Sequence, residues 1–184
     1  MKRLMDVALS VLALLALSPL LLVAAALIAL EDGLPVLFRQ VRVGRGGREF
    51  GMYKFRSMVK DASSIGPYHT LSDDARITRI GRFIRRTSID ELPQLLNVIK
   101  GDMSLVGPRP DVPAQRELYS EADWARRLSI RPGLTGLAQV TGRSETSFDQ
   151  RLALDLRYAD EVSVWLDLQI MVWTVRHLGG KNAN

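Results

Sequence analysis

The longest apolar run of the chain lies at its start. Residues 7–30 carry no charge. The run is longer than the roughly 7–15 apolar residues of a signal peptide, and it is long enough for a membrane-spanning helix. Ser18 and Pro19 lie at its middle, and a proline inside a helix removes one backbone hydrogen bond and bends the helix. We therefore expect a helix over this run that is broken at Ser18 and Pro19.

The charges around this run leave three placements open. Basic residues flank it on both sides, because Lys2 and Arg3 precede it and Arg39, Arg42, Arg45 and Arg48 follow it. A straight membrane span would place one basic group on the disfavoured side, whereas a helix that enters and leaves the same leaflet keeps both in the cytoplasm. A kinked span and a signal peptide cleaved near residues 24–26 remain alternatives. The charge pattern favours the re-entrant helix.

The rest of the chain reads as a small, mainly helical body. Apolar residues at 36–43 and 48–56 flank a glycine-rich turn at 44–47, which predicts a β-hairpin. A loop is expected at 61–74, and a loop with a strand at 130–142. Helical spacing of apolar residues predicts helices over 76–86, 92–99, 113–128, 148–158 and 164–175. The fold class is therefore α+β, with the long apolar helix as a membrane-associated segment.

Two of these helices allow more than one interpretation. Arginines surround the apolar face of the 76–86 helix, which indicates either a solvated cationic face or a surface that contacts phosphates or lipid headgroups. The apolar stripe of the 164–175 helix indicates core packing by default. Trp165 and Trp173 on that helix would also suit a membrane surface.

Composition narrows the function. The net charge of +5 and the pI of about 9.9 favour anionic partners, namely phosphates, acidic lipids or nucleic acid. Because the chain has no cysteine, a disulfide scaffold, a thiolate zinc site and a thiol nucleophile are excluded. The two histidines, His69 and His177, form no known metal-binding motif, and no signature of a nucleic-acid-binding fold is present.

Asp90 and Glu91 are the main candidates for chemistry. The structural alternative is helix capping, either by a Ser88–Glu91 capping box or by Asp90 itself, which Pro93 in the first turn would favour. In both cases two carboxylates lie at the positive end of a helix, where phosphate also binds. One carboxylate can then attack phosphorus while the other binds Mg²⁺.

Arginines beside proline or glycine form the second candidate feature. Pro108 and Pro110 restrict the backbone around Arg109, which suits bidentate phosphate binding, although a rigid turn with a surface arginine explains the pattern equally well. Arg131, two residues before Gly133, and Arg143, directly after Gly142, lie near glycines, where the backbone can approach a ligand closely.

Taken together, these motifs resemble the monotopic phosphoglycosyl transferases, also called bacterial sugar transferases. The resemblance runs from the apolar segment to residues 165–168 and is carried by four blocks: 54–58 (KFRSM), 90–94 (DELPQ), 101–110 (GDMSLVGPRP) and 131–136 (RPGLTG). It implies that residues 1–33 form a re-entrant membrane helix. Residues 34–184 would then form a cytosolic catalytic domain with interfacial amphipathic helices, at the cytoplasmic face of the bacterial inner membrane and in contact with membrane lipids.

The resemblance also implies a two-step reaction. Asp90 would attack the β-phosphate of a UDP-sugar and release UMP, and polyprenyl phosphate, usually undecaprenyl phosphate, would then accept the phospho-sugar. Glu91 would bind Mg²⁺, and Arg85, Arg109 and Arg143 would contact phosphate or nucleotide. Compared with relatives that carry further N-terminal helices, the sequence is expected to represent the catalytic unit alone.

Some features of the resemblance stay open. Leu137 and Thr141 depart from the tryptophan and asparagine common in the family, so the sugar is not identified. The sequence also leaves open whether the protein forms a homo-oligomer. Two other function classes compete: a membrane-anchored scaffold that binds anionic ligands without turnover, and a signal-anchored nucleic-acid binder, which the lack of a fold signature disfavours.

Overall fold

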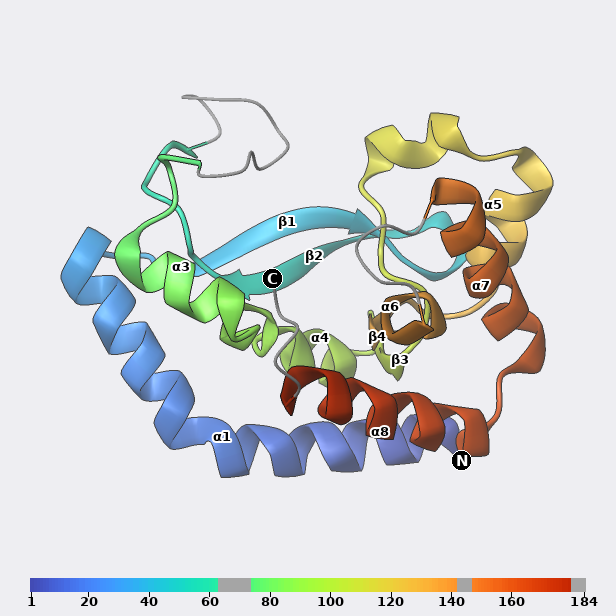
Figure 1. The fold of residues 1–184 in the computed structure, drawn as a ribbon, viewed down its shortest axis with the longest axis horizontal. Helices are drawn as coiled ribbons and strands as arrows, with labels where there is room; N and C mark the ends of the chain where they lie inside the picture. Colours follow the sequence, from blue (N-terminus) through green and yellow to red (C-terminus); the bar gives the residue numbers. More distant parts are fainter. Residues whose placement is uncertain (63–73, 142–146, 180–184) are drawn as a thin grey trace.

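A bent helix, α1 (Lys2–Asp32), runs along one side of the molecule in the computed structural model, which describes residues 1–62, 74–141 and 147–179 (Figure 1). Pro19 lies inside α1 and has no N–H for the Leu15 carbonyl. The Ser18 hydroxyl donates to that carbonyl instead, at 2.8 Å. The expected break at Ser18 and Pro19 is therefore a bend within one continuous helix, because the serine satisfies the backbone oxygen that the proline leaves without a donor.

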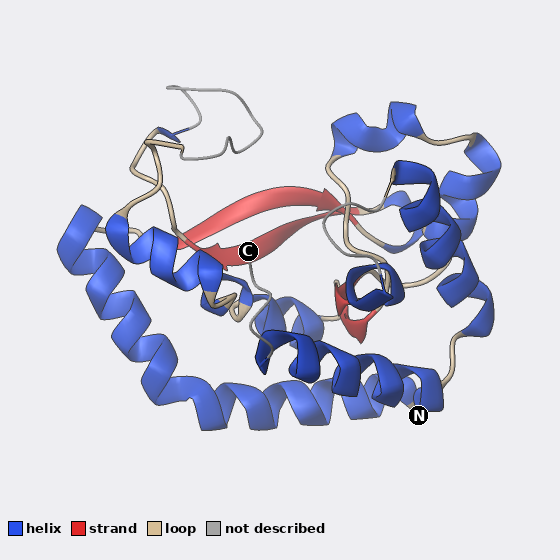
Figure 2. Cartoon of the chain, in the orientation of Figure 1, coloured by secondary structure: helices blue, strands red, loops and turns tan. Residues whose placement is uncertain are grey.

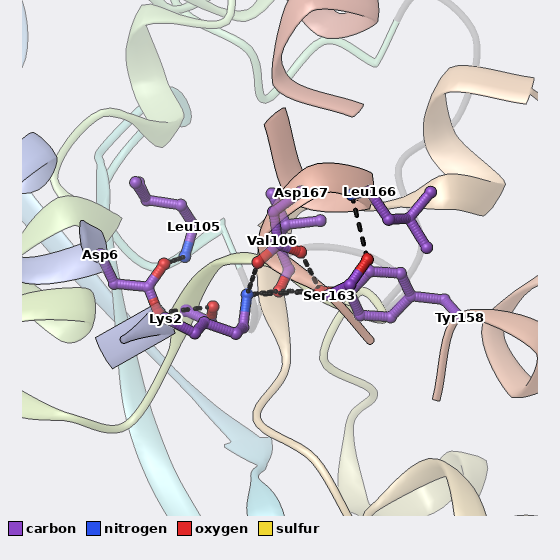
Figure 3. A network of polar contacts seen from close by, with 9 residues as sticks. Lys2, Asp6, Leu105, Val106, Tyr158, Ser163, Leu166 and Asp167 are labelled. Carbon is purple, nitrogen blue, oxygen red and sulfur yellow. Dashed lines mark hydrogen bonds and ion pairs between the residues drawn. The ribbon is translucent and has the colours of Figure 1, made fainter. Parts of the chain in front are cut away.

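The N-terminal end of α1 is attached to the body by buried polar contacts (Figure 3). The Lys2 ammonium group lies 2.6 Å from the carboxylate of Asp167, which is on α8 (Val164–Gly179). Asp6 is buried and accepts hydrogen bonds from the Ser104 hydroxyl at 2.8 Å and from the Leu105 backbone N–H at 3.2 Å. These contacts join the start of the apolar helix to the centre of the body.

The C-terminal end of α1 is attached to the same body. Glu31 accepts hydrogen bonds from the first backbone N–H groups of α3 (Arg79–Arg86), at 2.8 Å from Arg79 and 2.9 Å from Ile80. Arg56 donates to the carbonyl of Asp32 at 2.9 Å, and so caps the end of α1. Both ends of α1 therefore contact the domain that follows it in the chain.

A β-hairpin crosses the middle of the molecule, as predicted. Strands β1 (Leu37–Val43) and β2 (Glu49–Phe55) pair antiparallel from Leu37 opposite Phe55 to Val43 opposite Glu49 (Figure 2). The turn between them, η1 (Arg45–Gly47), contains Gly46 at φ 67° and Gly47 at φ 81°, a backbone region that favours glycine. The glycine cluster therefore sets the turn.

The remaining elements match the predicted class of fold, which is confirmed as α+β and mainly helical. In chain order they are η2 (Ile89–Glu91), α4 (Gln94–Lys100), β3 (Ser104–Val106), η3 (Pro113–Leu118), α5 (Glu121–Arg127), β4 (Gly133–Thr135), α6 (Leu137–Thr141) and α7 (Phe148–Glu161). Strands β3 and β4 form a short parallel pair. The strand expected within 130–142 is β4, whereas α6 was not predicted. Residues 63–73 of the expected loop lie outside the described part of the chain.

The single helix predicted over 113–128 is wrong. The segment forms the 3₁₀ helix η3 and then α5, with a break between them. The Ser120 side chain accepts a hydrogen bond from the Asp123 backbone N–H at 3.1 Å, so it caps a new helix at that point. The apolar pattern continues through the break, which is why periodicity alone missed it.

The core-packing interpretation of the α8 stripe is also wrong. Trp165 is 70% exposed, and Leu168, Val172, Trp173 and Val175 are exposed as well. The buried residues of this helix are Asp167 and Ile170. Much of α1 is exposed too, and within the described residues it is the one helix whose length and apolar composition would allow it to cross a membrane. The molecule therefore presents apolar side chains of α1 and α8 outward.

Candidate active site

Asp90 and Glu91 lie in the short turn η2, between α3 and α4. Ser88 begins this turn at φ 57°, in the left-handed region, and its side chain makes no capping hydrogen bond. A non-glycine residue in that region is strained, and such strain tends to occur at functional sites. The capping box and the cap by Asp90 are both wrong, because α4 starts after Pro93 without a side-chain cap and Glu91 has other partners.

Two cations from different elements hold the Glu91 carboxylate. Arg109, in the loop after β3, donates from Nη2 to Oε1 at 2.5 Å and from Nη1 to Oε2 at 3.3 Å. Lys54, near the end of β2, donates to Oε1 at 2.9 Å. Burial alone would raise the pKa of Glu91, but Arg109 and Lys54 outweigh it and lower that pKa to about 2. Glu91 is therefore ionised throughout the physiological range.

Asp90 has the opposite environment. It is 9% exposed, and no residue in the described part of the chain donates a hydrogen bond to its carboxylate. Burial and the neighbouring charge of Glu91 raise the pKa of Asp90 to about 6, although Lys54, Arg85 and Arg109 act in the other direction. Near neutral pH the Asp90 carboxylate is thus ionised and poorly solvated, which are the properties of an activated nucleophile.

An open cavity of about 1210 Å³ adjoins both carboxylates. Lys54, Arg85 and Arg109 line it on the side of Asp90 and Glu91. Other parts of its lining come from β1 and from Leu34 and Pro35, which lie just after the end of α1. A cavity of this size can hold a drug-sized or larger ligand. The three cations beside Asp90 and Glu91 are part of a lining rich in lysine and arginine, which suits a ligand that carries phosphate groups.

The loop that carries Arg109 is fixed by close backbone packing. A Cβ atom at Gly107 would lie 2.4 Å from the Arg131 carbonyl oxygen, and one at Gly133 would lie 2.1 Å from the Gly107 nitrogen. These glycines therefore allow β3 and β4 to pack closely against each other. The sequence had suggested that Gly133 lets the backbone approach a ligand, but the space beside it is filled by the backbone of Gly107. Arg131 is likewise structural, since its Nε donates to the Gly101 carbonyl at 2.9 Å.

The structure brings together four of the five predicted functional residues, because Asp90, Glu91, Arg85 and Arg109 all line the cavity. The fifth, Arg143, lies outside the described residues. Lys54 was not singled out from the sequence, although it belongs to the KFRSM block. Its contact with Glu91 depends on where β2 ends relative to η2, which a one-dimensional pattern does not show.

Glu91 is also the predicted metal ligand. Among the residues that the structure describes, no group of three or more Asp, Glu, His or Cys side chains could enclose a metal ion. Glu91 Oε2 has only the longer 3.3 Å contact with Arg109. A carboxylate oxygen accepts several partners, so Glu91 Oε2 could hold a Mg²⁺ ion, a cation that prefers oxygen ligands and binds through few carboxylates.

Known proteins resemble the chain over nearly its full length. The profile of the bacterial sugar transferase family matches residues 1–181. The uncharacterized sugar transferase EpsL of Bacillus subtilis (strain 168) is 47% identical over 176 residues, which cover 96% of this chain and 86% of EpsL. The galactosyl transferase CpsE of Streptococcus agalactiae serotype III is 50% identical over 158 residues, which cover 79% of this chain and 35% of CpsE.

A third relative is named for a complete reaction. It is the UDP-glucose:undecaprenyl-phosphate glucose-1-phosphate transferase of Caulobacter vibrioides, 47% identical over 184 residues that cover 96% of this chain and 69% of the relative. The names of these relatives differ in the sugar, galactose in one and glucose in another. The share of the relatives that the chain spans ranges from about a third to most of their length.

Proposed function

Because the chain belongs to the bacterial sugar transferase family, we propose that it transfers a phospho-sugar from a UDP-sugar to polyprenyl phosphate, with Asp90 as nucleophile. One observation carries the proposal. Asp90 is a poorly solvated carboxylate with a pKa of about 6, and it adjoins a cavity lined by Lys54, Arg85 and Arg109. An anionic nucleophile can approach a diphosphate only where cations offset the repulsion between them.

In the first step, a carboxylate oxygen of Asp90 attacks the β-phosphorus of the UDP-sugar. The bond between that phosphorus and the oxygen bridging to the α-phosphate breaks, UMP leaves with that oxygen, and the phospho-sugar remains on Asp90 as an acyl phosphate. Arg85 and Arg109 bind the phosphate oxygens, and Arg143 is a third candidate contact. Lys54 and Arg109 keep Glu91 ionised beside the reacting group.

In the second step, an oxygen of polyprenyl phosphate, undecaprenyl phosphate in bacteria, attacks the same phosphorus. The bond to Asp90 breaks, which restores the carboxylate and gives a polyprenyl diphosphate sugar. The phosphate of this acceptor lies at the depth of the lipid headgroups. An active site held beside the exit of a membrane helix is therefore already at the depth where the acceptor is found.

Mg²⁺ is the proposed cofactor, with Glu91 as its ligand. When bound, it would offset the charge of the diphosphate and assist departure of UMP. Glu91 then has two roles, because its ionised carboxylate orients Arg109 as well as attracting the metal ion. Replacement of Glu91 by glutamine should weaken both.

We place the protein at the cytoplasmic face of the bacterial inner membrane, with α1 as a re-entrant helix. This is supported by the two ends of α1, since Lys2 and Glu31 contact the same polar body. A straight span would carry these ends to opposite faces of a bilayer about 30 Å thick. The chain has no cysteine, so single cysteines can be introduced near Lys2 and near Gly33 and tested with a label added outside the cell. We expect neither to react, because a re-entrant helix keeps both of its ends in the cytoplasm. Reaction at one position only would mean a span.

The reaction is tested by incubating the purified protein in detergent with candidate UDP-sugars and Mg²⁺, and measuring UMP release and intact mass. We expect a mass increase of one phospho-sugar on the wild type and none on Asp90→Asn. Asp160→Asn is the matched control, because Asp160 is exposed and pairs with Arg126 at the surface. Turnover by Asp90→Asn would exclude Asp90 as nucleophile. Tight UDP-sugar binding without UMP release would favour a scaffold protein instead.

A further inference from the structure

Arg127, on α5, is a buried arginine whose three guanidinium nitrogens each contact a different partner. Its side chain is about 2% exposed. Nε donates to Asp155 at 3.0 Å, and Nη1 donates to Asp111 at 2.5 Å. Nη2 donates to the backbone carbonyl of Arg109 at 2.5 Å. A buried arginine is costly unless its hydrogen-bonding groups are satisfied in this way, so the side chain has one well-defined position.

The contact with Arg109 completes a series of backbone contacts. Four consecutive carbonyls, from residue 108 to residue 111, each accept a hydrogen bond, and the donors come from three parts of the fold. The Gly133 N–H in β4 donates to Pro108, Arg127 in α5 donates to Arg109, and β1 donates to Pro110 through Arg42 and to Asp111 through the Val43 N–H. Within the part of the chain that the structure describes, Arg127 is the donor to the carbonyl of residue 109 itself. The two prolines lack N–H groups, so the loop depends on its carbonyls for attachment.

The backbone and the side chain of Arg109 thus have different partners. Its carbonyl accepts from Arg127, while its guanidinium forms the bidentate contact with Glu91. From this geometry we propose that Arg127 is a positioning residue, which places the Arg109 guanidinium over Glu91 and toward the phosphates in the cavity without contacting the substrate. The inference rests on the proposed function and adds a residue to its machinery.

The alternative is that Arg127 merely joins α5 to α7 through Asp155. The neighbouring residue allows the two roles to be separated. Arg126 is also on α5 and pairs with Asp160, which is also on α7, but this pair is exposed and does not contact the loop of Arg109. Arg126→Lys therefore disturbs the same pair of helices and leaves Arg109 in place, which makes it the matched control.

The first test measures formation of the phospho-sugar adduct in a single turnover. A lysine at position 127 keeps the charge, but its three N–H donors share one nitrogen and cannot span three acceptors that are spaced for a planar guanidinium. We expect Arg127→Lys to lower the rate constant of adduct formation about 10- to 100-fold with little change in amplitude. Arg126→Lys should change it less than about twofold. A purely structural role would lower the amplitude, which reports the folded fraction, and leave the rate constant unchanged, and that result would overturn the proposal.

A second variant covers the case in which Arg127→Lys does not fold. The triple variant Arg127→Met, Asp155→Leu and Asp111→Asn removes the buried cation together with both of its buried carboxylates, a replacement that often preserves stability. The side-chain oxygen of an asparagine at position 111 can still accept the hydrogen bond that the Tyr119 hydroxyl donates at 2.7 Å. We expect this triple variant to melt near the wild-type temperature and still to form the adduct at least about 10-fold more slowly. A wild-type rate would contradict a positioning role.

The third measurement does not depend on activity. If Arg127 acts through Arg109 and Glu91, the melting-temperature losses of Arg127→Lys and Glu91→Gln should overlap when combined. A combined loss clearly smaller than the sum supports the proposal even if no UDP-sugar releases UMP, an outcome that would reject only the proposed function. Strictly additive losses would show that Arg127 and Glu91 are independent.

Discussion

Replacing the proposed nucleophile should make the protein more stable. Asp90 is 9% exposed, and burial together with the charge of Glu91 raises its pKa from 3.8 to about 6. The folded protein therefore holds the Asp90 proton more tightly than the unfolded chain does. An asparagine has nearly the shape of the neutral carboxyl and never ionises. Asp90→Asn should therefore remove a cost that the wild type carries at neutral pH, as is common when a site is optimised for activity.

The size and the sign of this effect follow from the two pKa values. Below pH 3.8 the Asp90 carboxyl is neutral in both the folded and the unfolded protein and does not lower the free energy of unfolding. Between pH 3.8 and 6 the cost of ionising it in the folded protein grows, and above pH 6 it is complete. At 1.36 kcal/mol per pKa unit, the step from 3.8 to about 6 corresponds to about 3 kcal/mol. In a protein of this size, a change of about 3 kcal/mol shifts the melting temperature by about 6–12 °C.

Glu91→Gln is the matched control, because replacing this adjacent carboxyl should lower the melting temperature and not raise it. Arg109 and Lys54 overcome the effect of burial and lower the pKa of Glu91 from 4.5 to about 2. Its ionised form therefore stabilises the folded state at any pH above 4.5, by about 3 kcal/mol, and this contribution is lost as the pH falls toward 2. Glu91→Gln should melt about 6–12 °C below the wild type at pH 7.5.

The assay is thermal denaturation of the two variants and the wild type in detergent, at pH 7.5 and pH 4, with EDTA present so that no metal ion contributes. We expect Asp90→Asn to melt above the wild type at pH 7.5 and close to it at pH 4. If Asp90→Asn melted below the wild type at pH 7.5, or gained the same amount at both pH values, Asp90 would not be a desolvated carboxylate and the electrostatic argument would be refuted.

Four further predictions concern single features. The rate constant of adduct formation should rise with pH to a plateau, with a midpoint near the Asp90 pKa of about 6, because only the ionised carboxylate attacks; quenched-flow mass spectrometry measures it. Lys54→Met should lower that rate constant by about tenfold or more at pH 7, since it removes a cation beside Glu91 and raises the pKa of Asp90. Gly107→Ala should lower the free energy of unfolding by about 1–3 kcal/mol in urea, because its Cβ would lie 2.4 Å from the Arg131 carbonyl oxygen. Thr78→Ala should cost about 1 kcal/mol in the same measurement without slowing the adduct, since Thr78 caps α3 and accepts from the Gly81 N–H at 2.8 Å.

The sequence predicted the elements that depend on local chemistry. Glycines 44, 46 and 47 set the hairpin turn, and Gly101 ends α4 with a left-handed residue at φ 97°. The helix over 113–128 failed because apolar spacing continues through the break at Ser120, where only the side-chain cap shows that a new helix begins. A serine followed by an acidic residue three positions later was the available signal.

The candidate catalytic pair was predictable for a different reason. Asp90 and Glu91 are adjacent in sequence, so their proximity needs no knowledge of the fold. Their cations come from distant segments, and only one of the two that hold Glu91 had a local signature, namely the prolines around Arg109. Lys54 had none, because its reach to Glu91 is set by the packing of β2 against η2.

The end of β2 links the active site to the apolar helix through three consecutive residues. Lys54 donates to Glu91, and Phe55 packs with Ala24 and other residues of α1 in a buried cluster. Arg56 donates to the last carbonyls of α1 and also lines the cavity. The distance from the end of α1 to the carboxylates of Asp90 and Glu91 is therefore fixed by one strand. For a helix embedded in a bilayer, the same strand would set the depth at which a lipid phosphate meets Asp90.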